Sequence, residues 1–418
     1  METKGIRQRS VGLDRQKYVN VHDESLRSEK LHHSQNARCW CTILASAIAT
    51  PLLLIAVYYN LLADENSLPV EFSLPDPPHL NGPLKPNNHL LKAEWLFEGE
   101  IIGPESIAFD HDHLYTGTSD GKIVDIYNGE MKTLATLGKH PCDGDEATCG
   151  RPLGLRFDAH GYLIACDTEL GFFKINPLTG DVELLLPSSV IVGGRPLTFL
   201  DDLDIDSDGY IYFTDASQYR FRDYVLDLLD GRGTGRLLRY DPLRNSTKIL
   251  LENLHFANGV QLAQSQDFVL VTECARARVI KYRLKGIGAG SAEVFAENLP
   301  CLPDNIRRSS SGGYWVACNS VRHDGTFSLY DFLARRPWMR WLASKVPAGL
   351  LFATFSPSTL LLELDDRGKI VRALMDLAGE KVRWSSEVQE NAGTLYIGSY
   401  LEPYIARIQL DQLNWNTD

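Results

Sequence analysis

The sequence lacks several features that mark common functional classes. Its 418 residues carry a net charge of −12 and the pI is about 5.4. No basic stripe interrupts this acidity, which argues against a nucleic-acid partner. No Cys/His cluster has the spacing of a zinc site, and no long amphipathic helix is evident outside the region around residues 328–347. These absences leave an acidic protein built mainly from short strands.

Charge is also missing from residues 39–63, Cys39 to Ala63. A run of about 25 uncharged residues is long enough to cross a bilayer as a helix. Eight Lys and Arg residues precede the run and two acidic residues follow it, a bias that predicts a cytosolic N-terminus. We expect residues 1–38 to be a disordered cytosolic tail and residues 39–63 a transmembrane signal-anchor helix. The sequence then predicts a single-pass type II protein of the plasma membrane or endoplasmic reticulum.

Two alternatives exist for residues 39–63, a cleaved signal peptide and a buried core helix. The apolar region of a signal peptide spans about 7–15 residues and follows a short basic start. Here 38 residues precede a much longer apolar run. The anchor is therefore the preferred interpretation.

The cysteines and one asparagine fit an oxidising compartment. Cys142 and Cys149 lie in the polar loop HPCDGDEATCG, which is short enough to close as a disulfide, although two free thiols are the alternative. Asn245 begins the only N-x-S/T triplet, NST, and is a candidate for lumenal glycosylation. Three further cysteines in strand-like runs are predicted to be core residues: Cys166, Cys274 and Cys318.

A Pro- and Asn-rich segment, residues 64–91, is expected to form an extended stalk, and a repeat begins after it. The second residue of each repeat is its key residue, and an apolar residue follows two positions later. The repeats are PESIAF, PLGLRF, LDDLDI, ANGVQL and PDNIRR, beginning at residues 104, 152, 200, 257 and 303. A tight turn and a more hydrophobic strand follow most of them. Four-stranded units spaced roughly 45–60 residues apart are typical of propeller blades.

A sixth unit, beginning SSEVQEN, contains only three strands before the chain ends. Residues 93–100, AEWLFEGE, are predicted to supply its outer strand, which would close the ring and cover both edges. We therefore predict an all-β fold, a six-bladed β-propeller of four-stranded antiparallel blades, over residues 92–418. An insertion at about 320–357 falls in blade five.

The first strand of each propeller blade lines the central channel, so the key residues should converge there. By register they are Glu105, Leu153, Asp201, Asn258, Asp304 and Ser386. Three carboxylates and an amide would repel one another unless a cation lay between them, and hard oxygen ligands suit Ca²⁺. Each residue alone has an ordinary alternative, such as an exposed carboxylate or a turn residue. Their shared register favours the metal site.

The same motifs resemble a known family. GPESIA, CGRPLGL, NGVQL and PDNIR are similar to the strictosidine synthase-like branch of the six-bladed propellers related to paraoxonases and gluconolactonases, and the resemblance covers residues 90–410. It implies a Ca²⁺ ion in the channel and arylesterase-type activity. The implied metal ligands are Glu105, Asp201, Asn258 and Asp304, with Asn305 adjacent.

Three positions depart from the family pattern. Asp201 stands where relatives generally have Asn, which adds a negative charge to the site. Leu153 stands where paraoxonases have a histidine that helps to activate water. Ser386 occupies the place of the glutamate of strictosidine synthase; the neighbouring Glu387 should face the opposite side of the strand, unless a bulge shifts the register.

The leading hypothesis is a membrane-anchored, Ca²⁺-dependent hydrolase of a small ester or lactone. Asp304 or Asp201 would serve as base or nucleophile, and Glu387 is the remaining catalytic candidate. One alternative is a non-catalytic cell-surface or lumenal binding propeller with a structural Ca²⁺. A third hypothesis is a condensing enzyme similar to strictosidine synthase.

Overall fold

The computed structural model describes residues 46–47, 49–54, 57, 68–352, 354–413 and 415. The chain divides into two compact units, residues 1–67 and residues 68–418. In the first unit the described residues are helical. None of the helices in the described part of the chain is long and apolar enough to cross a membrane. The predicted tail, residues 1–38, and most of the predicted anchor, residues 39–63, lie outside the described residues.

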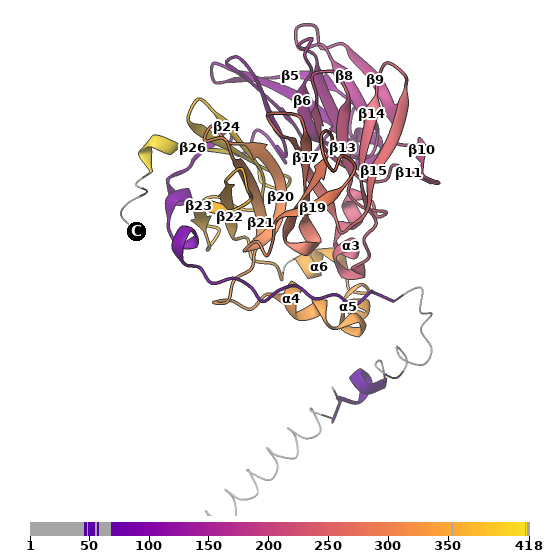
Figure 1. The fold of residues 1–418 in the computed structure, drawn as a ribbon, viewed down its shortest axis with the longest axis vertical. Helices are drawn as coiled ribbons and strands as arrows, with labels where there is room; N and C mark the ends of the chain where they lie inside the picture. The colour runs from indigo at the N-terminus through magenta and orange to yellow at the C-terminus, as the bar shows by residue number, and fades with distance from the viewer. Residues whose placement is uncertain are drawn as a thin grey trace, which may run out of the picture. The chain divides into compact units, whose positions relative to one another are not determined.

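The second unit is the predicted six-bladed propeller, in which every blade is a four-stranded antiparallel sheet (Figure 1). In blades one to five the strands follow chain order. They are β2–β5 (Ile107–Asp110, His113–Gly117, Lys122–Tyr127, Glu130–Thr136), β6–β9 (Pro152–Phe157, Leu163–Asp167, Gly171–Ile175, Val182–Pro187), β12–β15 (Leu200–Ile205, Ile211–Asp215, Gly235–Asp241, Ser246–Leu254), β16–β19 (Ala257–Leu262, Phe268–Glu273, Arg278–Arg283, Ala292–Ala296) and β20–β23 (Cys301–Arg308, Tyr314–Val321, Thr359–Leu364, Ile370–Asp376). A small hairpin, β10 (Ile191–Val192) with β11 (Arg195–Pro196), precedes blade three.

Blade six closes the ring as the sequence predicts. It contains β24 (Ser385–Asn391), β25 (Thr394–Ser399) and β26 (Ile405–Gln409). Its outer strand is β1 (Glu94–Leu96), which pairs antiparallel with β26. Trp95 stacks on Tyr404 with 4.9 Å between ring centroids, so the closing strand is held by side chains as well as by the backbone.

The hydrophobic core lies between neighbouring blades. The second strands of the blades are largely buried; β7 and β13, for example, are buried along their whole length. Such strands suit sheets that are covered on both faces. Burying one large apolar side chain stabilises a fold by roughly 1.5–3 kcal/mol, so the repeated contacts between blades maintain the ring.

Helices gather on one face of the propeller, below the sheets in Figure 1. α3 (Tyr224–Asp230) follows β13, and the blade-five insertion, residues 322–358 between β21 and β22, contains α4 (Leu329–Ala334), α5 (Pro337–Ala343) and α6 (Ala348–Phe352). Val225, Leu229 and Leu333 form a small core between them. The other helical turns are α2 (Glu146–Cys149), η2 (Gly82–Leu84), η3 (His89–Lys92), η4 (Phe221–Asp223), η5 (Cys274–Arg276) and η6 (Leu410–Gln412).

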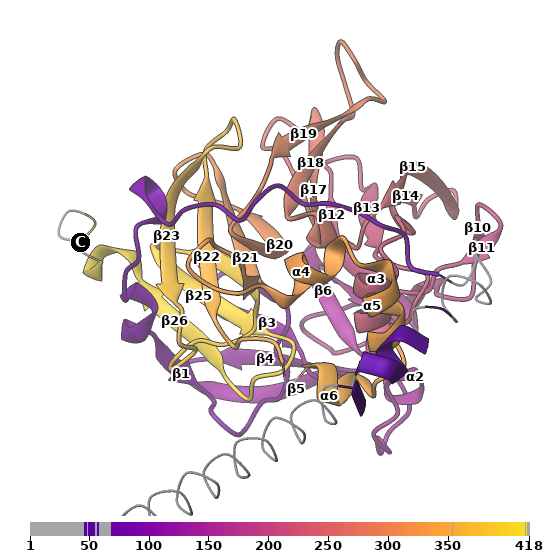
Figure 2. The same cartoon turned by 90° about the horizontal axis from the view of Figure 1, so that it is seen from below.

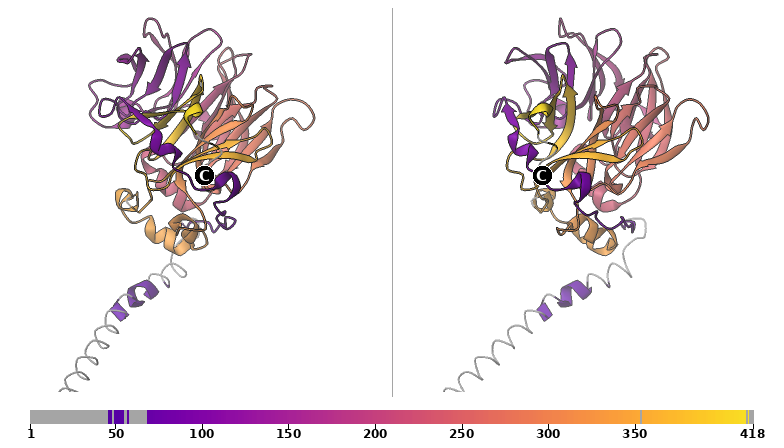
Figure 3. Two further views of the ribbon diagram at one scale, coloured as in Figure 1. Left: turned by 90° about the vertical axis from the view of Figure 1, so that its left-hand side faces the viewer. Right: turned by 60° about the vertical axis from the view of Figure 1, so that its left-hand side comes forward.

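The segment predicted as a stalk, residues 64–91, is extended from Leu68 onward and lies against the propeller. Figure 3 shows it running along the side of the molecule before the first blade. Phe72 and Leu74 are buried in a cluster with residues of α3 and α4. The amide of Val70 donates to the carbonyl of Asp230 at 2.8 Å, so the packing begins almost where the described segment begins.

The described part of the chain contains two disulfides. Cys142–Cys149 is the predicted bridge. Cys301–Cys318 is a second bridge, between β20 and β21, which the sequence did not predict. Cys318 is buried, but a strand-like run does not reveal a cysteine on the adjacent strand. Cys166 and Cys274 are buried free thiols.

Candidate metal and ester site

Glu105 lies just before β2, at the inner end of blade one, and its side chain is only 3% exposed. Asn305 donates its amide hydrogen to Oε1 at 2.8 Å. Oε2 is buried without a hydrogen-bond partner among the described residues. An unpartnered buried carboxylate oxygen is costly, so the position requires a counter-charge or a proton.

Bulges place the other key residues on the channel wall. The ladder between first and second strands is irregular at Leu200/Leu203, Ala257/Val260 and Pro303/Ile306. Each irregularity contains one key residue, and bulges re-aim side chains in this way. Asp201, Asn258 and Asp304 are each 4% exposed, and all three line one pocket with Glu105.

Unpartnered oxygens are concentrated at this pocket. Buried oxygens that have no hydrogen-bond partner among the described residues include Glu105 Oε2, Asp201 Oδ2, Asn258 Oδ1 and Asn305 Oδ1. Four such atoms in neighbouring inner-strand positions are an exception to the rule that buried polar atoms are paired. Hard, uncompensated oxygens are the donor set that Ca²⁺ uses.

The charges around the pocket also favour a bound cation. Burial, and then Asp304 and Asp201, raise the pKa of Glu105 well above its ordinary value. Burial, followed by Asp304 and Asp202, raises the pKa of Asp201, and burial raises the pKa of Asp304 to about 7. None of the pocket-lining residues that the structure describes is Lys, Arg or His. A cation would relieve this repulsion.

Carboxylates alone do not complete the site. No group of three or more His, Cys, Asp or Glu side chains in the described ranges is gathered as a ready set of metal ligands. The amide oxygen of Asn258 lies outside that count, yet it is one of the unpartnered atoms at the pocket. The residues fit a hard cation when amide and carboxylate oxygens act together.

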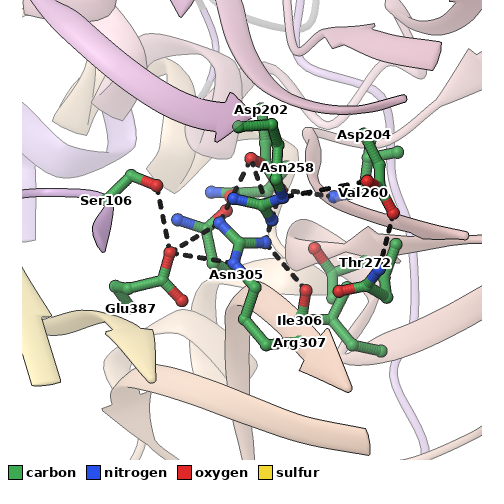
Figure 4. A network of polar contacts seen from close by, with 12 residues as sticks. Ser106, Asp202, Asp204, Asn258, Val260, Thr272, Asn305, Ile306, Arg307 and Glu387 are labelled. Atoms are coloured by element: carbon green, nitrogen blue, oxygen red, sulfur yellow. Dashed lines mark hydrogen bonds and ion pairs between the residues drawn. The ribbon is translucent and has the colours of Figure 1, made fainter. Parts of the chain in front are cut away.

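A layer of ion pairs fills the channel beside these residues (Figure 4). Arg307 contacts Asp202 of blade three through Nη1 at 2.7 Å and Glu387 of blade six through Nη2 at 2.6 Å. Ser106 also donates to Glu387, at 3.1 Å, and the amide of Val260 donates to Asp202 at 2.7 Å. We call Arg307, Asp202 and Glu387 the axial ion layer. It connects blades three, five and six across the channel.

The pocket beside the carboxylates has largely aromatic walls. Its apolar walls are Leu153, Phe199, Phe221, Tyr224, Leu228, Phe256, Leu302, Phe352, Phe355, Trp384 and Tyr400. The hydroxyls of Tyr224 and Tyr400 lie 3.2 Å apart. Ligand pockets are commonly apolar with a few convergent polar groups, and this pocket has that form.

The remaining predicted residues do not all line the pocket. Glu387 is not among the described pocket-lining residues; a bulge does occur between Ser385 and Glu387, but Arg307 holds the carboxylate in the axial ion layer. Asn305 lies behind Glu105 and is not a lining residue. Leu153 lines the pocket where a histidine had been considered. Ser386 donates its hydroxyl to the backbone carbonyl of Glu105 at 3.2 Å.

Asn245 lies in the turn between β14 and β15 and is exposed. The Tyr240 hydroxyl donates to its side-chain oxygen at 3.1 Å. The predicted glycosylation position is therefore at the surface.

Sequence reasoning missed the axial ion layer. Asp202 and Glu387 occupy the position directly after a key residue, and Arg307 lies three positions after Asp304. Opposite charges at these repeat positions were visible in LDDLDI and PDNIRR. Their pairing could not be inferred from the sequence, because it depends on which side chains meet in the channel. Arg307 of blade five meets Asp202 of the non-adjacent blade three as well as Glu387 of the adjacent blade six.

Comparisons with known proteins identify the family. A model described as strictosidine synthase matches residues 201–287, and one described as the N-terminal part of strictosidine synthase-like proteins matches residues 82–126. Adipocyte plasma membrane-associated protein of Bos taurus is 44% identical over 373 residues, which cover 88% of this chain and 90% of that protein. The Gallus gallus protein of the same name is 40% identical over 99% of this chain and 100% of its own.

Solved structures share the fold. A gluconolactonase from Xanthomonas campestris matches with a TM-score of 0.51 at 14% identity and covers 81% of this chain and 97% of its own. Regucalcin, a calcium-binding protein of Agrobacterium tumefaciens, matches with a TM-score of 0.50 at 10% identity, over 75% and 92% of the two chains. At such identities the likeness concerns architecture alone. On the sequence matches, which confirm the predicted family, the chain belongs to the strictosidine synthase-like family of β-propellers, together with the adipocyte plasma membrane-associated proteins.

Proposed function

We propose that the protein is a Ca²⁺-dependent hydrolase of esters or lactones, of the arylesterase type. The observation that carries the proposal is the set of unpartnered, buried oxygens at an aromatic pocket. A purely structural channel would be expected to pair these atoms internally. A pocket with apolar walls and carboxylates at one end suits a substrate that has an apolar group attached to a reactive ester carbonyl.

Glu105, Asp201, Asn258 and Asp304 would hold the ion, while the hydrogen bond from Asn305 orients Glu105. When bound, Ca²⁺ supplies positive charge that can polarise an ester carbonyl. The relatives solved as gluconolactonase and calcium-binding regucalcin are compatible with this assignment but share only the fold.

The chain's own groups supply binding and proton transfer. The aromatic walls bind the apolar part of the substrate and exclude water from it. The Asp304 carboxylate would accept a proton from the attacking water. Asn319 donates to Asp304 Oδ2 at 2.7 Å and fixes the orientation of that base. Asp201 is the alternative base.

Glu387 does not take part in this scheme. Its Oε2 accepts from Arg307 and Ser106, and it is fully buried. A glutamate that is committed to an ion pair is poorly suited to shuttle protons during an amine–aldehyde condensation. Glu387, the candidate residue for the condensing reaction, is thus not among the described residues that line the pocket.

We also propose that the protein is a type II membrane protein of the plasma membrane or endoplasmic reticulum, with the propeller outside the cytosol. The uncharged run at residues 39–63 and its flanking charges support this. The name of the mammalian and avian relatives, plasma membrane-associated protein, is in agreement.

The test compares Glu105→Gln with Glu98→Gln in the purified full chain, because Glu98 is exposed on the surface. We expect phenyl acetate hydrolysis to require Ca²⁺, to be lost in EDTA, and to fall at least 100-fold in Glu105→Gln while Glu98→Gln retains it. Activity that survives both chelation and Glu105→Gln would rule out the proposal.

A binding propeller with a structural cation is the second candidate. It is favoured by the absence of histidine among the described residues that line the pocket. In that case EDTA and Glu105→Gln would lower the melting temperature, but the wild-type chain would hydrolyse no ester. The melting curve and the ester assay together distinguish the two functions.

A further inference from the structure

Three of the blades carry an aromatic residue at the same repeat position. Phe199, Phe256 and Trp384 each lie two positions before a key residue and directly before an inner strand, β12, β16 or β24. All three line the pocket. Phe256 and Trp384 have a left-handed backbone, with φ of 58° and 49°, which bulky residues rarely adopt. The repeat therefore places aromatic rings beside the oxygen atoms, two of them at a cost in backbone strain.

The helices on one face of the propeller complete the aromatic walls. Figure 2 shows the molecule from that side, on which α3 and α6 lie. Phe221 of η4, Tyr224 of α3 and Phe352 of α6 line the pocket. Phe352 packs on Trp384 with 4.7 Å between ring centroids. These four side chains are half-buried, so part of each ring is open to a ligand.

The charge around the pocket is negative. The three lining carboxylates carry three negative charges when ionised, of which a bound Ca²⁺ would offset two, and the described lining residues include no Lys, Arg or His. Arg151 contacts the Phe221 ring, 5.2 Å from its centroid, but it is not a lining residue and it pairs with Glu146 at 3.9 Å.

The channel beside the pocket adds no compensating positive charge. Two arginines there face three carboxylates: Arg156 and Arg307 contact Asp202, Asp204 and Glu387. A ligand in the pocket therefore experiences a negative potential, which favours a cationic group.

We propose that the pocket binds a quaternary ammonium group and that esters carrying such a group are the preferred substrate class; this second part rests on the proposed hydrolase function. The negative faces of aromatic rings attract a quaternary ammonium ion without providing hydrogen-bond acceptors. The hydroxyls of Tyr224 and Tyr400 contact each other at 3.2 Å, so the walls offer few acceptors to a primary amine. Phe352 and Trp384 would contact the ammonium group while the ester carbonyl lies at the carboxylates.

Hydrolysis of such an ester consumes one water molecule. Water adds to the carbonyl carbon, and the bond from that carbon to the alcohol oxygen breaks. The alcohol leaves with its quaternary ammonium group and takes up one proton. The products are a carboxylate and a cationic alcohol, with one proton released overall.

The binding experiment titrates choline and 3,3-dimethylbutan-1-ol into the full chain with Ca²⁺ in a calorimeter. The two alcohols have nearly the same shape, and only choline is charged, so the ratio of their affinities isolates the effect of the charge. We expect choline to bind at least tenfold more tightly. Trp384→Leu, which keeps an apolar side chain but removes the ring, should weaken choline binding at least fivefold and binding of the neutral alcohol less than twofold.

Trp338→Leu is the matched control, because Trp338 is half-buried but does not line the pocket. It should bind both alcohols as the wild type does. Melting temperatures verify that both variants are folded.

Equal affinities for the two alcohols, or no binding of choline, would overturn the ammonium site. Equal weakening of both affinities in Trp384→Leu would also overturn it, because the ring would then provide only an apolar contact.

The substrate class is tested with acetylcholine and its neutral isostere 3,3-dimethylbutyl acetate. Each kcat/KM is divided by the rate constant of hydrolysis by hydroxide, which corrects for the different reactivity of the two esters. We expect the corrected value to be at least tenfold higher for acetylcholine, and equal values would overturn the preference. Hydrolysis of neither ester would overturn the hydrolase proposal and the substrate class that rests on it, whereas choline binding in the calorimeter would still support the ammonium site.

Discussion

Asp201 is one of the three carboxylates that line the pocket, together with Glu105 and Asp304. A unit charge at a few ångströms from a cation contributes on the order of 1–4 kcal/mol in a partly screened site. We therefore expect Asp201→Asn to weaken Ca²⁺ binding at least tenfold, measured by calorimetric titration of the full chain. Asp208→Asn, in an exposed turn of the same blade, is the control. Equal affinities in the three proteins would mean that Asp201 does not face the ion.

Asp227 offers a test that is independent of the metal. It is buried in α3, Ser217 and Thr234 donate to its Oδ1, and burial raises its pKa to about 7. The pKa of Asp227 in the folded protein exceeds the unfolded value near 3.9. The contribution of Asp227 to the free energy of unfolding is therefore fully present below pH 4 and is lost as the pH rises through 7. Wild type should lose more stability than Asp227→Asn between pH 5 and 8.

Denaturant unfolding in EDTA measures the free energy of unfolding of both proteins at each pH. The additional loss in the wild type can reach roughly 1.4 kcal/mol for each pH unit between the folded and unfolded pKa values. Parallel stability curves for the two proteins would contradict a raised pKa for Asp227.

The inner strands β16 and β20 approach each other closely at Gly259. A Cβ atom on Gly259 of β16 would lie 2.6 Å from Asn305 Cα and 2.9 Å from the Asp304 carbonyl oxygen. These contacts are with backbone and cannot be relieved by a rotamer change. Gly259→Ala should therefore cost about 1–3 kcal/mol and disturb the neighbouring Asp304.

Gly349→Ala in α6 is the matched control, because a Cβ there meets nothing within 4 Å and alanine favours a helix. Thermal unfolding should separate the two variants clearly. A Gly259→Ala protein as stable as wild type would show that the inner strands can move apart.

Local features of the sequence predicted the individual strands and the convergence of Glu105, Asp201, Asn258 and Asp304 at one pocket, because a repeat fixes register. They did not predict what lies across the ring. Arg307 of blade five pairs with Asp202 of blade three, which lies 105 positions earlier, and Cys301 bridges to Cys318 on the adjacent strand. The packing of the segment after Leu68 was also not predictable, because Pro-rich composition specifies an extended backbone and not its partner.

The axial ion layer makes the stability of distant blades interdependent. Removing Arg307 would leave Glu387 without its ion-pair partner and Asp202 with only the longer contact to Arg156, at 3.8 Å, and breaking a buried ion pair typically costs 3–5 kcal/mol. We expect Arg307→Met to lower the free energy of unfolding by that amount, measured in denaturant. Arg283→Met, which removes an exposed pair with Glu293, should cost less than about 1 kcal/mol. Comparable losses in both variants would show that the layer has no special role.

The pairing of β1 with β26 has a consequence for biosynthesis. The ribosome makes Glu94 more than 300 residues before its partner Arg407, so the first outer strand must wait, unpaired, until the final blade emerges. A nascent chain paused before residue 405 exposes two open sheet edges, and chaperones that shield such edges would be needed longest during that interval.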